Sequence, residues 1–160
     1  LGLAGPTDMW LCGLDKAGEW VLAHEAVHIW NAGGSPGWVG EGLADYVGYL
    51  EMIKYDGVFL KAELREDYLS FWDEFKSTEK DYPLSEKKYD YTYGAAKSML
   101  FWELMHKEYG AEFIYACFSH NSTNPKLTNA DFRELLERFG EKNTERVLSG
   151  WIIEGDYELN

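Results

Sequence analysis

Cysteine, proline, basic residues and long apolar runs are all scarce in this chain of 160 residues. Its two cysteines, Cys12 and Cys117, form neither a C-x-x-C pair nor a zinc-ligand spacing, which leaves buried thiols, the favoured reading, or one long-range disulfide. Only 15 Lys and Arg face 28 Asp and Glu, and the net charge of −13 argues against a nucleic-acid partner. Because no run of about 18 apolar residues exists, no transmembrane segment is predicted.

Apolar and aromatic side chains, in contrast, are abundant. They form 46% and 16% of the chain, which excludes intrinsic disorder, and the length fits a single domain over residues 1–160. Glycines and Pro6 interrupt the first 18 residues, where one short strand is expected around 9–14. The predicted fold class is mainly α, α+β at most, with a minimal N-terminal β element. Helical periodicity predicts helices at about 19–31, 39–53, 61–76, 93–109, 111–119, 128–139 and 144–153.

The first predicted helix carries the motif His24-Glu25-Ala26-Val27-His28, an H-E-x-x-H pattern. Positions i and i+4 share one helix face, so both imidazoles can reach the same metal ion. Zinc takes such ligands and makes water acidic enough to lose a proton near neutral pH. We therefore expect His24 and His28 to bind zinc and Glu25 to act as the general base.

A carboxylate further along the chain completes the predicted metal site. Catalytic zinc usually has three protein ligands and one open position. The glycine-rich turn at 33–37 can fold the second helix back against the first, so that Glu41 faces the two histidines as the third ligand. Asp45 lies one turn later on the same face. It can accept the other N–H of a histidine, in the first place His24, or it is simply a solvated charge.

The H-E-x-x-H motif followed by W-x-x-E-G-x-A resembles the gluzincin (peptidase MA-like) metallopeptidases, which include thermolysin-like and aminopeptidase-N-like enzymes. The resemblance covers residues 24–49. It implies a zincin-like catalytic domain in which the H-E-x-x-H helix packs on a second helix. That second helix would carry the ligand Glu41, and Asp45 would support a zinc-bound histidine. Twelve residues separate His28 from Glu41, fewer than in those enzymes, so the connection must differ.

A second segment, Tyr91-Thr92-Tyr93-Gly94-Ala95, resembles the Y-x-x-G-A segment of the aminopeptidase-N-like family. There the tyrosine hydroxyl donates to the oxyanion of the tetrahedral intermediate, a role that maps to Tyr91, with Tyr93 as the alternative. Both tyrosines could instead serve only in packing. The G-x-M-E-N segment of that family, whose Glu binds the free amine of the substrate, has no matching Glu in residues 2–9, although Asp8 could substitute. We therefore expect a peptide or protein substrate cleaved as by an endopeptidase rather than an aminopeptidase.

Two other functions stay open at this point. A catalytically inactive, peptidase-like module could bind zinc and cleave nothing, although the intact Glu25 argues against it. A structural zinc domain needs a fourth protein ligand, and no further Cys or His has a suitable spacing. We expect His106, and His120 in a loop, to be surface residues.

The length also bears on what the chain represents. Gluzincins place a β-sheet before the H-E-x-x-H helix, and its edge strand binds the substrate backbone. Only 23 residues precede His24, and the chain begins at Leu1, so we expect a fragment of a longer protein with further domains. The resemblance also favours an extracytoplasmic or secreted location.

Overall fold

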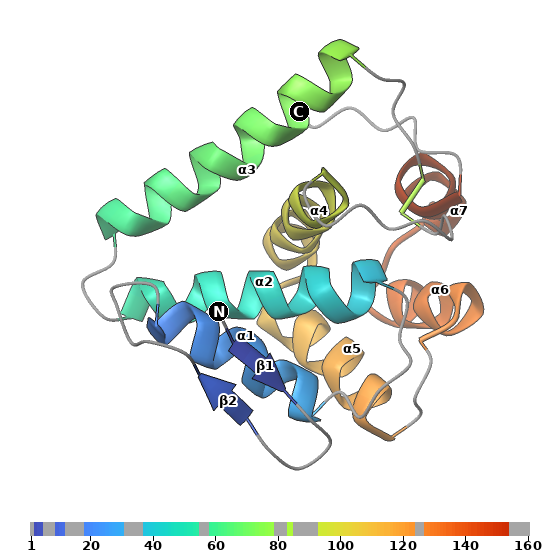
Figure 1. Cartoon of the computed structure of the whole chain (residues 1–160). Coiled ribbons are helices and arrows are strands. Elements are labelled where there is room, and N and C mark those ends of the chain that lie inside the picture. Colours follow the sequence, from blue (N-terminus) through green and yellow to red (C-terminus); the bar gives the residue numbers. More distant parts are fainter. Residues whose placement is uncertain are drawn as a thin grey trace.

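Helices dominate the structure, and one small pair of strands lies at its amino end (Figure 1). The computed structural model describes residues 2–4, 9–11, 18–30, 37–54, 58–78, 83–84, 93–123 and 127–153. Within these ranges the mainly α fold class is confirmed. The β element is larger than the single strand expected: β1 (Gly2–Ala4) and β2 (Met9–Leu11) form an antiparallel pair, with Leu3 opposite Trp10.

The helices follow the apolar periodicity of the sequence, and every expected helix is present with its ends displaced by little more than one turn. The last expected helix is divided, because its second part winds as a π-helix. The elements are α1 (Gly18–Trp30), α2 (Gly37–Lys54), α3 (Val58–Thr78), α4 (Tyr93–Tyr109), α5 (Ala111–Thr123), α6 (Asn129–Arg138), α7 (Thr144–Val147) and the π-helix η1 (Leu148–Ile153).

Local chemistry explains several helix ends. Thr128 and Asp131 form a capping box at the start of α6. Oγ1 of Thr128 accepts from the backbone N–H of Asp131 at 3.2 Å, and Oδ2 of Asp131 accepts from the backbone N–H of Thr128 at 2.9 Å. Gly110 follows α4 with φ of 79°, and Gly140 follows α6 with φ of 92°. This left-handed conformation strains other residues, so glycine ends both helices cleanly.

The helix α2 is the centre of the arrangement. It runs back along α1, with which it is in contact, and it also packs against α3 and α4, while the β1–β2 pair lies against α1 (Figure 1). Residues at i, i+4 and i+8 of α2 form one stripe that meets a stripe of the same spacing on α4. The first stripe is Trp38, Gly42 and Tyr46, and the second is Ser98, Trp102 and His106.

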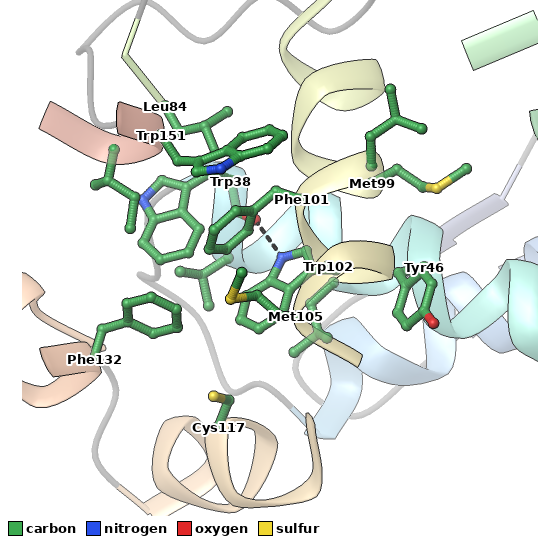
Figure 2. Packing of buried hydrophobic residues seen from close by; sticks show 14 of the residues in the cluster. Trp38, Tyr46, Leu84, Met99, Phe101, Trp102, Met105, Cys117, Phe132 and Trp151 are labelled. Carbon is green, nitrogen blue, oxygen red and sulfur yellow. Dashed lines mark hydrogen bonds between the residues drawn. The ribbon is translucent and has the colours of Figure 1, made fainter. Parts of the chain in front are cut away.

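Aromatic rings form the core between α2, α4 and α6 (Figure 2). Trp38 stacks on Trp102 with ring centroids 5.8 Å apart, and Phe101 and Phe132 meet Trp38 edge-on at 5.6 and 5.5 Å. Nε1–H of Trp102 donates to the backbone oxygen of Trp38 at 2.9 Å. Burial of rings this large stabilises the fold by about 2–3 kcal/mol each before entropy is counted, so the first turn of α2 is firmly anchored.

Two details of the core differ from or refine the expectations. The apolar periodicity of residues 61–76 places Tyr68, Phe71 and Trp72 on one face of α3, but Phe71 is 42% exposed, whereas Tyr68 and Trp72 are buried. The reason is angular: Phe71 lies one turn from Tyr68 but on the margin of the stripe. Cys117 is a buried free thiol, as favoured, and Cys12 lies outside the described residues.

None of the described helices combines the length and the apolar character that a helix needs to cross a bilayer. This agrees with the expectation from the sequence.

A close approach of α2 to α4 at Gly42 leads to a matched pair of stability predictions. A Cβ at Gly42 would lie 2.4 Å from both Cβ and Oγ of the buried Ser98, so Gly42→Ala should lower the free energy of unfolding by about 1–3 kcal/mol. A Cβ at Gly40, on the same helix, would have nothing within 4 Å. Gly40→Ala should therefore raise that free energy by about 0.5–1 kcal/mol through helix propensity. Urea denaturation of both variants measures the difference, and equal effects would contradict the close approach.

Candidate metal centre

The two histidines of the H-E-x-x-H motif lie side by side on α1. One helical turn separates them, and Nε2 of His24 lies 3.0 Å from Nε2 of His28. Their rings meet edge-on, with centroids 4.8 Å apart and an interplanar angle of 74°. This arrangement directs both Nε2 atoms toward one point outside α1, as the i, i+4 spacing predicts.

Glu41 reaches the same point from α2. Its Oε2 atom lies 3.6 Å from Nε2 of His24 and 3.4 Å from Nε2 of His28. The core contacts of Trp38 place the first turn of α2, and Gly42 allows the helix to lie close against α4. The packing of α2 therefore sets the position of Glu41, and the structure brings together the three residues predicted as ligands.

These three residues could hold a metal ion. In a tetrahedral zinc site with bonds of about 2.0–2.2 Å, neighbouring ligand atoms are about 3.3–3.6 Å apart. Two of the three observed separations, 3.4 and 3.6 Å, lie in that range, and the third, 3.0 Å, is slightly shorter. Among the residues that the structure describes, this group has three members and no fourth, which matches an open rather than a closed site. Imidazole and carboxylate donors also suit other first-row divalent ions, so the donor set alone does not select zinc.

Asp45 lies against the far side of His24. Its Oδ1 atom is 2.8 Å from Nδ1 of His24, and its side chain is only 7% exposed. A carboxylate here holds the proton on Nδ1, which leaves the lone pair of Nε2 directed at the metal position and fixes the ring orientation. Asp45 is therefore in contact with a histidine of the motif, as the sequence predicts, and that histidine is His24.

Opposite charges in the group shift two pKa values. Burial by itself lowers the pKa of His24, but the hydrogen bonds and charges of Asp45 and Glu41 outweigh it and raise that pKa to about 9. Hydrogen bonds from His24 and His28 lower the pKa of Glu41 to about 2. Burial raises the pKa of Asp45, and the hydrogen bonds from His24 and Tyr68 oppose this. Without metal, these shifts keep His24 protonated and Glu41 ionised at neutral pH.

Tyr68 is a member of the site that the sequence interpretation missed. It lies on α3 and is 9% exposed, and its interaction with Asp45 lowers the pKa of that carboxyl, against the larger effect of burial. The apolar periodicity of α3 assigned Tyr68 to the core, and that assignment is correct for its ring. The one signal available was the hydroxyl itself, since a buried tyrosine usually finds a hydrogen-bond partner.

The predicted general base, Glu25, is a buried side chain that is 8% exposed and follows His24 on α1. A buried carboxylate is costly without nearby positive charge, which a bound cation would supply.

The predicted oxyanion donor, Tyr91, lies outside the described residues. Tyr93, the alternative, begins α4 and is half-buried.

The other two histidines are less solvent-exposed than expected. The hydroxyl of the buried Tyr46 forms a hydrogen bond of 2.6 Å with Nδ1 of His106, so this histidine has a structural partner instead of a free surface position. His120 lies within α5 and not in a loop, and its Nε2 is 3.7 Å from Oδ2 of Asp131. Neither histidine belongs to the group of His24, His28 and Glu41.

Comparison of the chain with protein families, with curated proteins and with solved structures finds no match. The geometry of the group is therefore the basis for any functional argument.

The raised pKa of His24 predicts how metal affinity depends on pH. A metal ion requires the neutral ring, so below pH 9 binding must displace the proton that His24 carries. Affinity should therefore rise about tenfold for each pH unit between pH 6 and 8, with close to one proton released from His24 per ion bound. Calorimetric titration with zinc in two buffers of different ionisation enthalpy counts the protons. Affinity that is flat over this range, with no proton released, would contradict the prediction.

Proposed function

We propose that the chain is a zinc-dependent metallopeptidase of the gluzincin type, which hydrolyses peptide bonds. The observation that carries the proposal is the convergence of Nε2 of His24, Nε2 of His28 and Oε2 of Glu41 within 3.0–3.6 Å of one another. Two further features support it: the Asp45 carboxylate behind His24, and the burial of Glu25, which follows His24 in the motif. Each of these residue types is needed for metal-assisted hydrolysis at that position.

The residues divide the work between binding and proton transfer. His24, His28 and Glu41 hold the ion, and Asp45 holds the ring of His24 in the orientation that binding requires. A bound zinc ion would activate water as a nucleophile and polarise the carbonyl that is attacked. Glu25 takes the proton of the attacking water and delivers it to the leaving amine. Tyr91 is proposed, from the family resemblance, to donate to the oxyanion of the tetrahedral intermediate.

The proposed mode of action is endopeptidase rather than aminopeptidase. The segment 2–9 contains no glutamate to bind a free amino terminus, and Asp8 is its single acidic residue. Recognition of a free amine requires a carboxylate placed for it, whereas internal cleavage does not.

The central prediction concerns Glu25→Gln. Removal of the general base should lower kcat for cleavage of unfolded casein about 10²- to 10⁴-fold, because the amide cannot accept the proton. Zinc content, measured by mass spectrometry of the dialysed protein, should stay near one ion per chain. Cleavage should be assayed with freshly loaded native and variant protein at the same zinc concentration.

A charge control separates this effect from a change in net charge. Glu112→Gln removes one negative charge from an exposed position on α5 and should leave both zinc content and cleavage unchanged. Equal activity of native protein and Glu25→Gln would refute the mechanism. Stoichiometric zinc with no cleavage by the native protein would instead favour the inactive, peptidase-like module.

The endopeptidase mode has its own test. Acetylation of the amino terminus of a peptide substrate removes its positive charge, and we expect kcat/KM for an internal bond to change by less than about twofold. Mass spectrometry of the products identifies the bond cleaved. Release of single residues from the free amino terminus, abolished by acetylation, would contradict the assignment.

A further inference from the structure

The residues on either side of Glu41 are both glycines, and one of them leaves no room for a side chain. A Cβ at Gly42 would lie 2.4 Å from Cβ and Oγ of Ser98 on α4, and 3.3 Å from its backbone carbonyl carbon. A Cβ at Gly40 would have nothing within 4 Å. A methyl group at position 42 would therefore push α2 away from α4, whereas a methyl group at position 40 would not.

Two hydrogen bonds hold the same pair of helices together on both sides of Gly42. One turn before it on α2, the backbone oxygen of Trp38 accepts from Nε1–H of Trp102 at 2.9 Å. One turn after it, the hydroxyl of Tyr46 forms a hydrogen bond of 2.6 Å with Nδ1 of His106. Both bonds weaken steeply when they are stretched, so α2 is kept against α4 along this whole stretch. The absence of a side chain at Gly42 is what permits that distance.

Glu41 is covalently next to this close contact. Its Oε2 atom lies 3.6 Å from Nε2 of His24 and 3.4 Å from Nε2 of His28, and both histidines belong to α1. Ligands from two helices keep such distances only while the helices keep their relative positions, and a metal site tolerates displacements of about 0.5 Å. To bring a Cβ at Gly42 from 2.4 Å to an ordinary contact of 3.4 Å, α2 and α4 must part by about 1 Å.

We propose that Gly42 is a positioning residue of the metal centre, which sets the place of Glu41 by letting α2 lie close against α4. The proposal rests on the proposed function, since it takes Glu41 as a metal ligand. It makes α4, which carries none of the three candidate ligands, a support of the site. The competing explanation is that the flexible side chain of Glu41 absorbs any displacement of α2, in which case Gly42 matters for stability and not for metal binding.

The test compares Gly42→Ala with Gly40→Ala, which adds the same methyl group to the other neighbour of Glu41. Competition with a chromogenic zinc chelator at pH 7 gives the zinc affinity of each variant. We expect Gly42→Ala to weaken zinc affinity about tenfold, because the ligand is displaced beyond what the site tolerates, and Gly40→Ala to change it by less than about twofold. Equal zinc affinities for the two variants would overturn the proposal.

A size exchange across the contact tests whether the effect arises at Ser98. Ser98→Gly removes the Cβ and the hydroxyl that a methyl group at position 42 would meet. Combined with Gly42→Ala, it should bring zinc affinity back to within about twofold of the native value. Zinc affinity as low as in Gly42→Ala alone would contradict the proposal.

Ser98→Gly alone serves as the control for stability. Glycine weakens a helix interior, so this variant should have a lower midpoint of urea denaturation than the native protein. Its zinc affinity should stay within about twofold of native, because the hydrogen bonds of Trp38 and Tyr46 still hold α2 against α4. A loss of zinc affinity that follows the loss of stability in every variant would favour the competing explanation.

Co²⁺, which suits the same donors, gives a readout of geometry instead of affinity. The d–d absorption bands of Co²⁺ are strong in four-coordinate sites and weak in six-coordinate sites. At full loading, we expect weaker bands in Gly42→Ala than in the native protein, and native bands both in Gly40→Ala and in the combination of Gly42→Ala with Ser98→Gly. Bands of native strength in Gly42→Ala would count against a displaced Glu41.

Gly42→Ala combined with Gly40→Ala covers the case in which Gly42→Ala is too unstable to study. The second alanine strengthens α2 through helix propensity without reaching Ser98, so zinc affinity should remain about tenfold below that of Gly40→Ala. Native zinc affinity in this variant would overturn the proposal. The outcomes also separate the two proposals: native protein that binds no zinc refutes the proposed function, whereas zinc binding with equal Gly42→Ala and Gly40→Ala affinities refutes this inference alone.

Discussion

The contact between Asp45 and His24 is the interaction on which the geometry of the site depends. Oδ1 of Asp45 and Nδ1 of His24 are 2.8 Å apart, and both side chains are largely buried. The contact joins α2 to α1 at the level of the H-E-x-x-H motif. Glu41 lies one turn before Asp45 on α2, so the same contact places Glu41 near the two Nε2 atoms. A single pair of helices in this register therefore brings together three atoms that could bind a metal ion and a carboxylate that lies against one of their side chains.

The same helix that carries the two carboxylates also forms the core. Trp38, Gly42 and Tyr46 face α4, and the adjacent stripe of Glu41 and Asp45 faces α1. This division explains how a polar group can be placed accurately in a small helical fold: the buried rings fix the rotation of α2 about its axis, and that rotation decides where the carboxylates point. A change in the core is therefore transmitted to the site, whereas a change on the exposed faces of α5 or α6 is not.

Local sequence predicts much of this arrangement. The features that it does not predict share one physical cause. Three features are local in the sequence and could therefore be predicted. They are the i, i+4 spacing of His24 and His28, the same spacing from Glu41 to Asp45, and the apolar periodicity of the helices. The partners of Tyr68 and His106 are not local. They depend on how helices far apart in the chain cross one another, and no spacing within one helix encodes that. Phe71 shows the same limit, because the width of an apolar stripe depends on what packs against it.

The most direct measurement of the central claim is X-ray absorption spectroscopy at the zinc edge of the zinc-loaded protein. The expected first shell contains four nitrogen or oxygen neighbours at about 2.0–2.1 Å, with the multiple-scattering signature of two imidazoles. Sulfur at about 2.3 Å, or a shell without imidazole, would contradict the assignment of His24, His28 and Glu41 as the metal ligands.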